Sequence, residues 1–145
     1  MFKHIFLPTD GSDLSLRAVD TGLALAAKLG ASVYAFHVVP PFPSMTYFVD
    51  IVQANQEFYL KEAIERGEGY LNDVEQRAKA AGVPCKTGYE IDGRPHAAIV
   101  AAATKQECDL IVMASHGWRG VDRLLLGSET QKVLVNGDVP VLVCH

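Results

Sequence analysis

Short apolar segments alternate with helical patterns along the whole chain, and this alternation limits the possible folds more than any other feature. Four short runs are apolar and a fifth is more polar; together they cover residues 2–7, 33–39, 110–113, 140–144 and 85–91. Short apolar runs without strict alternation are typical of strands buried on both faces. Helical patterns fill the intervals, at about 12–29, 60–81, 94–106 and 128–136.

Strands that are separated by helices form parallel sheets with right-handed crossovers. We therefore predict an α/β fold, a doubly wound five-stranded parallel sheet with helices on both faces. In such sheets a ligand binds beyond the carboxyl ends of the strands, where the strand order reverses. This edge of the sheet is the first place to look for a functional site.

One helix and one connection stand out. Seven residues recur at alternating spacings of four and three, and they form one stripe that predicts a helix ending at Gly82: Leu60, Ile64, Gly67, Leu71, Val74, Ala78 and Ala81. Before it, the segment Pro40–Asn55 holds three prolines and several bulky apolar residues. It is longer than a usual crossover loop. It is interpreted either as an irregular packed loop or as a lid or partner surface.

Composition narrows the functional class. The chain has 145 residues, which suffice for a single domain over 1–145 with its own core. The net charge is −4, so the chain lacks the excess of basic residues that is typical of a nucleic-acid binder. No run of apolar residues approaches the roughly 20 that a membrane span needs. The three cysteines are far apart, without a Cys-x-x-Cys pair. We expect a soluble, cytoplasmic protein with neither nucleic acid nor membrane as a partner.

The segment 110–134 is the most informative for chemistry. It runs from an apolar strand through a glycine-containing loop into a helix, where Ser128 to Gln131 fit a capping box. A helix N-terminus binds anions through its free amides and its dipole. Amides of Gly127, Ser128 and Glu129 are therefore candidate phosphate donors. The alternative is that Ser128 only caps its helix.

Other polar residues have two interpretations each. Asp10 follows the first strand, where its carboxylate could accept from a base amino group, or where Asp10 or Ser12 could cap the first helix. Arg119 could donate to phosphate oxygens or belong to a solvated loop. His116 follows Ser115, and we expect adjacent residues not to supply the geometry of a nucleophile and its base. No P-loop motif and no Gly-x-Ser-x-Gly elbow occurs.

The same segment resembles the signature of the universal stress protein family, whose ATP-binding members carry Gly-x2-Gly-x9-Gly-Ser/Thr. Here the span is Ala114-Ser115-His116-Gly117, nine residues, then Gly127-Ser128, so that alanine stands at the first glycine position. The opening Ile5–Ser12, the His37-Val38 pair and the closing Pro140–Val143 also resemble the family, so the likeness covers essentially the whole chain.

The resemblance implies an adenine nucleotide alpha hydrolase-like fold and an ATP site. Asp10 and Val38 would hold adenine, Ala114 and Gly117 would line the ribose and phosphate path, and Gly127, Ser128 and Glu129 would meet the phosphates. The predicted nucleotide site also includes Met113 and Arg119. Mg²⁺ or Mn²⁺ would be held by the phosphates and not by a protein metal site. Pairing of the last strand, Val139–Cys144, would form a homodimer.

Three functions compete at this stage. The first is an ATP-binding stress-response or signalling module without catalytic residues, for which Gly117→Val or Gly127→Val should abolish binding and leave the fold intact. The second is a dimeric interaction protein that binds no nucleotide and uses the 40–55 segment. The third is an enzyme, at most a slow ATPase, since no general base is placed beside the phosphates. A phospho-acceptor receiver is excluded because Asp10 lacks an adjacent acidic partner and no lysine follows the last strand.

Overall fold

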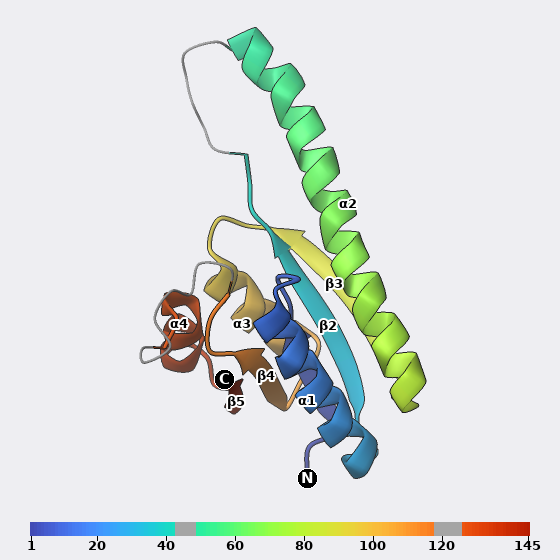
Figure 1. Ribbon diagram of the computed structural model, residues 1–145. Helices are drawn as coiled ribbons and strands as arrows, with labels where there is room; N and C mark the ends of the chain where they lie inside the picture. Colours follow the sequence, from blue (N-terminus) through green and yellow to red (C-terminus); the bar gives the residue numbers. More distant parts are fainter. Residues whose placement is uncertain (43–48, 118–125) are drawn as a thin grey trace.

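The computed structural model describes residues 1–42, 49–117 and 126–145, and the side chains of all of these except 49–54. The elements, in chain order, are β1 (His4–Pro8), α1 (Asp13–Leu29), β2 (Ser32–Val39), α2 (Val49–Ala81), β3 (Cys85–Ile91), α3 (Pro95–Lys105), β4 (Leu110–Ala114), α4 (Ser128–Asn136) and β5 (Val141–Cys144). All five strands are parallel, in the order β3-β2-β1-β4-β5 (Figure 1). The predicted doubly wound sheet is confirmed.

The strand order reverses beside β1. This strand pairs with β2 on one side and with β4 on the other, although β4 comes much later in the chain. The connections that leave β1 and β4 therefore start next to each other at the carboxyl edge of the sheet. That is the position at which the fold class predicts a ligand site.

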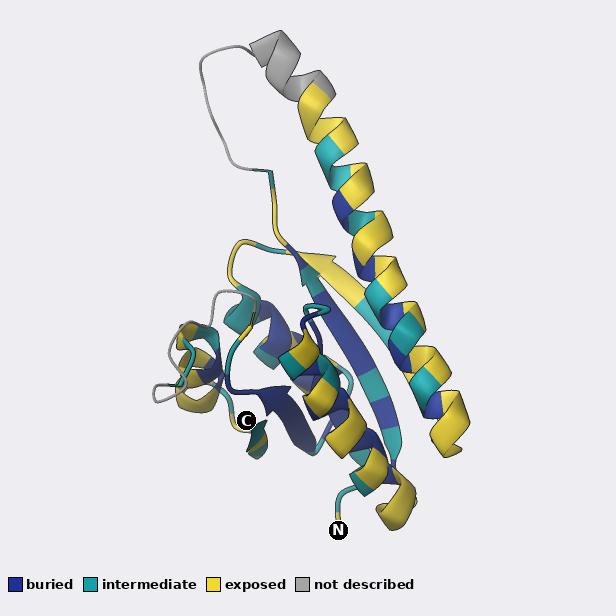
Figure 2. Cartoon of the chain, viewed as in Figure 1, coloured by how far each residue is buried: buried dark blue, intermediate teal, exposed yellow. Residues whose placement is uncertain are grey.

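Two separate cores cover the two faces of the sheet. Alternate residues of β1 point to opposite sides, so that Ile5 and Leu7 pack with α1 and α2 while Phe6 packs with α3 and α4. Figure 1 shows the same arrangement, with α1 and α2 on one face and α3 and α4 on the other. The buried strands of Figure 2 explain why the central runs of the sequence are continuously apolar.

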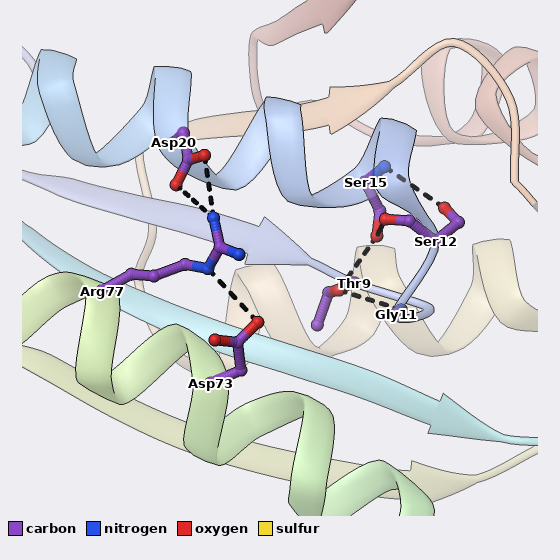
Figure 3. Close-up of polar contacts among 7 residues, drawn as sticks. All are labelled: Thr9, Gly11, Ser12, Ser15, Asp20, Asp73 and Arg77. Carbon is purple, nitrogen blue, oxygen red and sulfur yellow. Dashed lines mark hydrogen bonds and ion pairs between the residues drawn. The ribbon is translucent and has the colours of Figure 1, made fainter.

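The start of α1 is capped by its own sequence. Ser12 is the N-cap, and its hydroxyl accepts from the amide of Ser15 at 3.2 Å (Figure 3). The Asp10 Oδ1 atom accepts from the amide of Ser12 at 2.9 Å. Of the two capping residues considered above, Ser12 caps the helix and Asp10 orders the turn before it. Gly30 ends α1 in the left-handed conformation, which favours glycine.

Helix α2 is longer than the sequence pattern predicts. It begins at Val49, so the predicted irregular connection over 40–55 is wrong for residues 49–55, and residues 43–48 lie outside the described part. The first turns of α2 project beyond the sheet (Figure 1), where Phe58 is 63% exposed. The apolar stripe in the sequence starts only at Leu60, which is why the pattern predicts a shorter helix.

The rest of α2 lies close against β2. The predicted stripe is buried at its centre, at Gly67, Leu71, Val74 and Ala78, whereas Ala81 is exposed. A Cβ at Gly67 would overlap the ring of His37, so glycine lets the helix approach this strand. A polar contact adds to this packing: one Arg77 nitrogen lies 2.9 Å from both carboxylate oxygens of Asp20 on α1 (Figure 3). Its stabilisation is modest because both groups are partly exposed.

The two remaining helices match their predicted bounds within one or two residues. α3 has Pro95 in its first turn, and α4 runs from Ser128 to Asn136. Among the described residues, no helix is long and apolar enough to cross a membrane. Because α4 starts above the carboxyl end of β4, it reaches the switch point from the side opposite to α1 and α2.

Candidate functional site

A cavity of about 960 Å³ opens at the carboxyl ends of β1, β2 and β4. Its lining includes residues from strands, turns and helices of both faces. Of the predicted nucleotide-site residues, the lining contains Asp10, Val38, Met113, Ala114, Gly117, Gly127, Ser128 and Glu129. The remaining one, Arg119, lies outside the described residues. The structure thus gathers the predicted residues around one space, although their binding roles stay predictions.

The turn after β1 is rigidly built. Gly11 has a φ of +79°, a left-handed conformation that favours glycine, and a Cβ there would overlap the ring of Tyr70. The Thr9 hydroxyl accepts from the amide of Gly11 at 3.2 Å and contacts the hydroxyl of Ser15 at 3.1 Å (Figure 3). With Ser12 bonded to one oxygen of Asp10, this turn presents the carboxylate at the cavity wall in a defined position.

The turn after β4 touches the Asp10 carboxylate. A Cβ added at Gly117 would overlap Oδ2 of Asp10, and among the described residues it would meet no backbone atom within 4 Å. The φ of Gly117 is not positive, since the positive-φ glycines among the described residues are Gly11, Gly30 and Gly82. Gly117 is therefore needed for space beside Asp10, and not for an unusual backbone conformation.

The alanine at the first motif position fits without strain. Ala114 is the last residue of β4 and pairs with Cys144 of β5. Among the described non-glycine residues only Glu107 has a positive φ. Alanine at this position therefore costs no backbone strain, and its methyl group is a small addition to the cavity wall.

His37 has a structural role at the other side of the cavity. Its ring is 7% exposed, and Nδ1 lies 2.8 Å from the carbonyl oxygen of Thr9. A carbonyl only accepts, so Nδ1 carries the proton and donates. Tyr70 of α2 packs edge-on against the ring, with centroids 5.3 Å apart. No group of three or more potential metal ligands occurs among the described residues.

The start of α4 differs from the predicted capping box. The N-cap is Gly127, no side chain caps the helix, and Ser128 is already the first helical residue. The amide of Gly127 donates to the carbonyl of Ser115 at 2.7 Å. The prediction that this amide donates to a phosphate is therefore wrong. A Cβ at Gly127 would lie 2.7 Å from that carbonyl oxygen and 3.3 Å from Cα of His116. Glycine is required here by close backbone packing.

The amides of Ser128 and Glu129 remain open. They are the first two of the helix, which have no intrahelical acceptor, and neither has an acceptor among the described residues. Thr130 fixes the helix start, because its hydroxyl donates to the carbonyl of Ala114 at 2.9 Å. The partial positive charge of the helix therefore points into the cavity from a fixed position.

The Glu129 side chain is not open. Its Oε2 atom accepts from the amide of His96 on α3 at 2.9 Å and lies 3.1 Å from Nδ1 of the same residue. Burial acts to raise the pKa of Glu129, but the two His96 bonds and Lys132 outweigh it and hold that pKa below its ordinary value. The carboxylate is therefore ionised at neutral pH and held toward α3.

Ser115 and His116 do form a hydrogen bond, contrary to the expectation for adjacent residues. The Ser115 hydroxyl and Nδ1 of His116 are 3.0 Å apart. Ser115 is only 1% exposed, however, and it is not part of the cavity lining. A hydroxyl in that position cannot reach a substrate in the cavity, so the pair orders the loop after β4.

Comparison with known proteins agrees with this geometry. The model of the universal stress protein family matches residues 1–145. The chain belongs to the universal stress protein family. The universal stress protein MJ0531 of Methanocaldococcus jannaschii is 38% identical over 144 residues, which cover 99% of this chain and 82% of the relative.

Two solved structures place this universal stress protein among its structural relatives. The protein MJ0577, described as a test case for structure-based assignment of function, has a TM-score of 0.84 at 26% identity and covers 99% of this chain and 96% of its own. A universal stress protein in complex with cAMP has a TM-score of 0.72 at 27% identity, with 99% and 97% covered. The family likeness that was inferred from the motif residues is thus confirmed.

Several cavity residues of this universal stress protein were missed by sequence reasoning. Ala63, Arg66 and Tyr70 of α2 line the cavity, and so do Asp92 and Pro95 near the start of α3. The helical stripe places Gly67 and Leu71 on the buried face, but it says nothing about which turn of α2 passes the strand ends. The His96 bond to Glu129 has no signal in the sequence either.

Proposed function

We propose that this universal stress protein binds an adenine nucleotide in the cavity at its switch point. One observation carries the proposal: the open amides of Ser128 and Glu129 face the same cavity as Asp10 and Val38. An anion site and a wall suited to a base thus lie in one space of nucleotide size. The cAMP complex of a family member supports this assignment.

The proposed binding mode follows from the two ends of the cavity. Adenine would lie at the Asp10 and Val38 end, where the carboxylate accepts from its amino group. The phosphate would accept from the amides of Ser128 and Glu129 and from the exposed Ser128 hydroxyl. Gly117 would keep the passage between the two ends free of a side chain.

ATP with Mg²⁺ or Mn²⁺ is the nucleotide that we propose on the strength of the family motif. Asp10 and Asp92 line the cavity, and their carboxylates could accept hydrogen bonds from metal-bound waters. The metal would neutralise phosphate charge when bound.

We propose a switch, and not an enzyme. A nucleotide that binds one conformation or one assembly better than another shifts the population toward it. His116, the histidine next to the loop, is bonded to the buried Ser115 and not aligned by a second group among the described residues. Three free cysteines fit a reducing compartment, which supports a cytoplasmic role in the stress response.

We also propose a homodimer through the β5 edge, Val139–Cys144. β5 is one of the two edge strands of the sheet and, within the described part of the chain, pairs with β4 alone. Leu142 on this strand is 40% exposed, and Leu134 and Val135 of the neighbouring α4 are 43% and 83% exposed. Pairing with a second copy would cover this apolar edge, which otherwise favours aggregation. Analytical ultracentrifugation of wild type and Leu142→Asp tests it: the variant should sediment as a monomer.

A matched pair of glycine variants tests nucleotide binding. Gly117→Ala pushes the Asp10 carboxylate from its position, so the affinity for AMP and for ATP with Mg²⁺ should fall by about tenfold or more, the loss expected for a displaced bond to a charged group. The control is Gly69→Ala on α2, where an added Cβ has nothing within 4 Å. Both are compared with wild type by titration calorimetry on protein freed of bound nucleotide.

The titrations distinguish failure of nucleotide binding from failure of the assigned binding mode. Thermal melting shows that each variant is folded before titration. Absence of heat with folded, ligand-free wild type rejects the proposal, and unchanged affinity in Gly117→Ala rejects the assigned binding mode. The alternative function, a partner-binding protein with an unused cavity, would then gain support from the projecting start of α2 with its exposed Phe58.

A further inference from the structure

The N-terminus of α3 takes its cap from another helix. Arg94 is its N-cap residue and provides no side-chain cap. The Glu129 carboxylate of α4 accepts the amide and the ring proton of His96 instead, and its other oxygen lies 3.4 Å from Nζ of Lys132. A negative charge is thus fixed between the starts of α3 and α4, where it complements the dipole of α3.

This carboxylate lies beside the proposed phosphate position. Glu129 itself contributes one of the two open amides of α4, and Ser128 contributes the other. Both residues line the cavity, together with Pro95 at the start of α3. A first phosphate on the two amides would therefore be bound in part by the residue that carries this carboxylate. Further phosphates that extend toward α3 would approach the carboxylate directly.

The described residues that line the cavity carry few positive charges. Among the described residues that line the cavity, the carboxylates are Asp10, Asp92 and Glu129, and the one permanently charged cation is Arg66. Arg66 belongs to α2, which packs on β2 and β3, whereas α4 packs on α3 at the opposite side. Lys132 is half exposed and is not part of the lining. Among the described residues, negative charge near Glu129 is therefore countered by Lys132, by the bonds from His96 and by the helix dipoles.

We propose that Glu129, held in place by His96, is a specificity-determining residue that disfavours uncompensated charge beyond the first phosphate. The site then prefers a nucleoside monophosphate, a cyclic nucleotide or a metal-complexed triphosphate over a metal-free polyphosphate. This inference rests on the proposed function and deepens it, because it states which charge forms of a nucleotide the cavity accepts.

The test uses Glu129→Gln in the full chain. Glutamine keeps the size of the side chain and a carbonyl oxygen that can accept from the amide of His96, so it removes the charge and retains the cap. Titration calorimetry gives affinities for AMP, for ATP with a chelator and for ATP with Mg²⁺. The control is Glu57→Gln, an exposed residue of α2 away from the cavity, which removes the same charge.

We expect Glu129→Gln to raise the affinity for metal-free ATP about three- to tenfold, and the affinity for AMP by less than about twofold. Mg²⁺ should therefore increase ATP affinity more in wild type than in the variant. High salt should narrow the difference, because it screens the repulsion. Glu57→Gln should leave the ratio of ATP to AMP affinity as in wild type.

The ratio of two affinities within one protein is insensitive to a loss of folded material, so a purely structural role of Glu129 would not change it. An unchanged or lowered ratio for metal-free ATP in Glu129→Gln overturns the inference and leaves nucleotide binding standing. If folded, ligand-free wild type binds neither AMP nor ATP, the proposed function fails and this inference fails with it.

Discussion

Helices α1 and α4 both start at the switch point, but their N-termini are closed in different ways. In α1 the cap is local: Ser12 accepts from Ser15, and Asp10 accepts from Ser12. In α4 the N-cap is Gly127, which has no side chain to offer, and the amides of Ser128 and Glu129 have no acceptor among the described residues. α3 is intermediate, because its cap is Glu129 of α4.

The difference between these helices shows how a fold can leave the first amides of a helix without an acceptor. A helix that is capped by its own sequence has already satisfied part of its donors, so it gains less from a ligand. A helix that starts at glycine leaves its dipole and donors to whatever enters the cavity. The same strand–turn–helix connection therefore stabilises the fold at α1 and is available for binding at α4.

The largest expected effect tests whether Gly127 is a structural requirement of α4. Gly127→Ala places a Cβ 2.7 Å from the Ser115 carbonyl, a backbone atom that cannot turn aside. We expect the free energy of unfolding to fall by about 1–3 kcal/mol. Gly69→Ala, in an open part of α2, should instead raise it by about 0.5–1 kcal/mol. Urea denaturation measures both.

This outcome would correct the expectation that substitution at Gly127 spares the fold. Equal stability of Gly127→Ala and wild type would show that the close approach to Ser115 is not a constraint. Gly117 is the better position for a binding variant, because the described atoms that oppose a Cβ there belong to the Asp10 side chain and not to the backbone.

A smaller effect separates the two serines at the helix starts. Ser12→Ala removes the cap of α1 and should cost about 1 kcal/mol of unfolding free energy. Ser128→Ala removes an exposed hydroxyl that caps nothing, so it should change stability by less than about 0.5 kcal/mol. It should weaken nucleotide binding all the same. Equal destabilisation by the two substitutions would mean that α4 is capped as α1 is.

The sequence predicts much of the fold because the buried strands carry a strong local signal. β4 is buried at every position, from Leu110 to Ala114, and reads as a continuous apolar run. The start of α2 at Val49 is not predicted by the same criterion, because the helical stripe in the sequence begins only at Leu60. The motif residues point to the cavity through their likeness to a family, whereas periodicity and spacing alone left the roles of Asp10 and Ser128 undecided.

Local capping patterns mispredict a helix start where residues distant in the sequence form hydrogen bonds with it. The capping-box pattern assigns Ser128 to the N-cap, but Thr130 bonds to Ala114 and Gly127 bonds to Ser115, so Gly127 is the N-cap and the helix starts one residue earlier. Glu129 suits a capping box or an exposed helix start, yet its carboxylate is bonded to His96, 33 positions earlier. Such contacts follow from the packing of α3 against α4 and have no counterpart in local sequence.

The smallest expected effect concerns the shared cap between α4 and α3. His96 holds the pKa of Glu129 below its ordinary value, so Glu129 stabilises the fold above the pKa it has in the unfolded chain, near 4.5. As pH falls through the lower folded pKa, that contribution is lost. The unfolding free energy of wild type should therefore exceed that of Glu129→Gln at pH 6, and the difference should shrink as the pH falls through 4.5 to about 3.

Urea denaturation at pH 6 and at about pH 3 measures this difference, and a small value is expected because the carboxylate is partly exposed. Glu57→Gln, which removes an exposed carboxylate of α2, serves as the control and should show no such convergence. A difference that stays constant over the range would mean that Glu129 supports α3 by its shape and not by its charge. In that case the cap of α3 would resemble the neutral Ser12 cap of α1, and the charge of a bound ligand would not affect it.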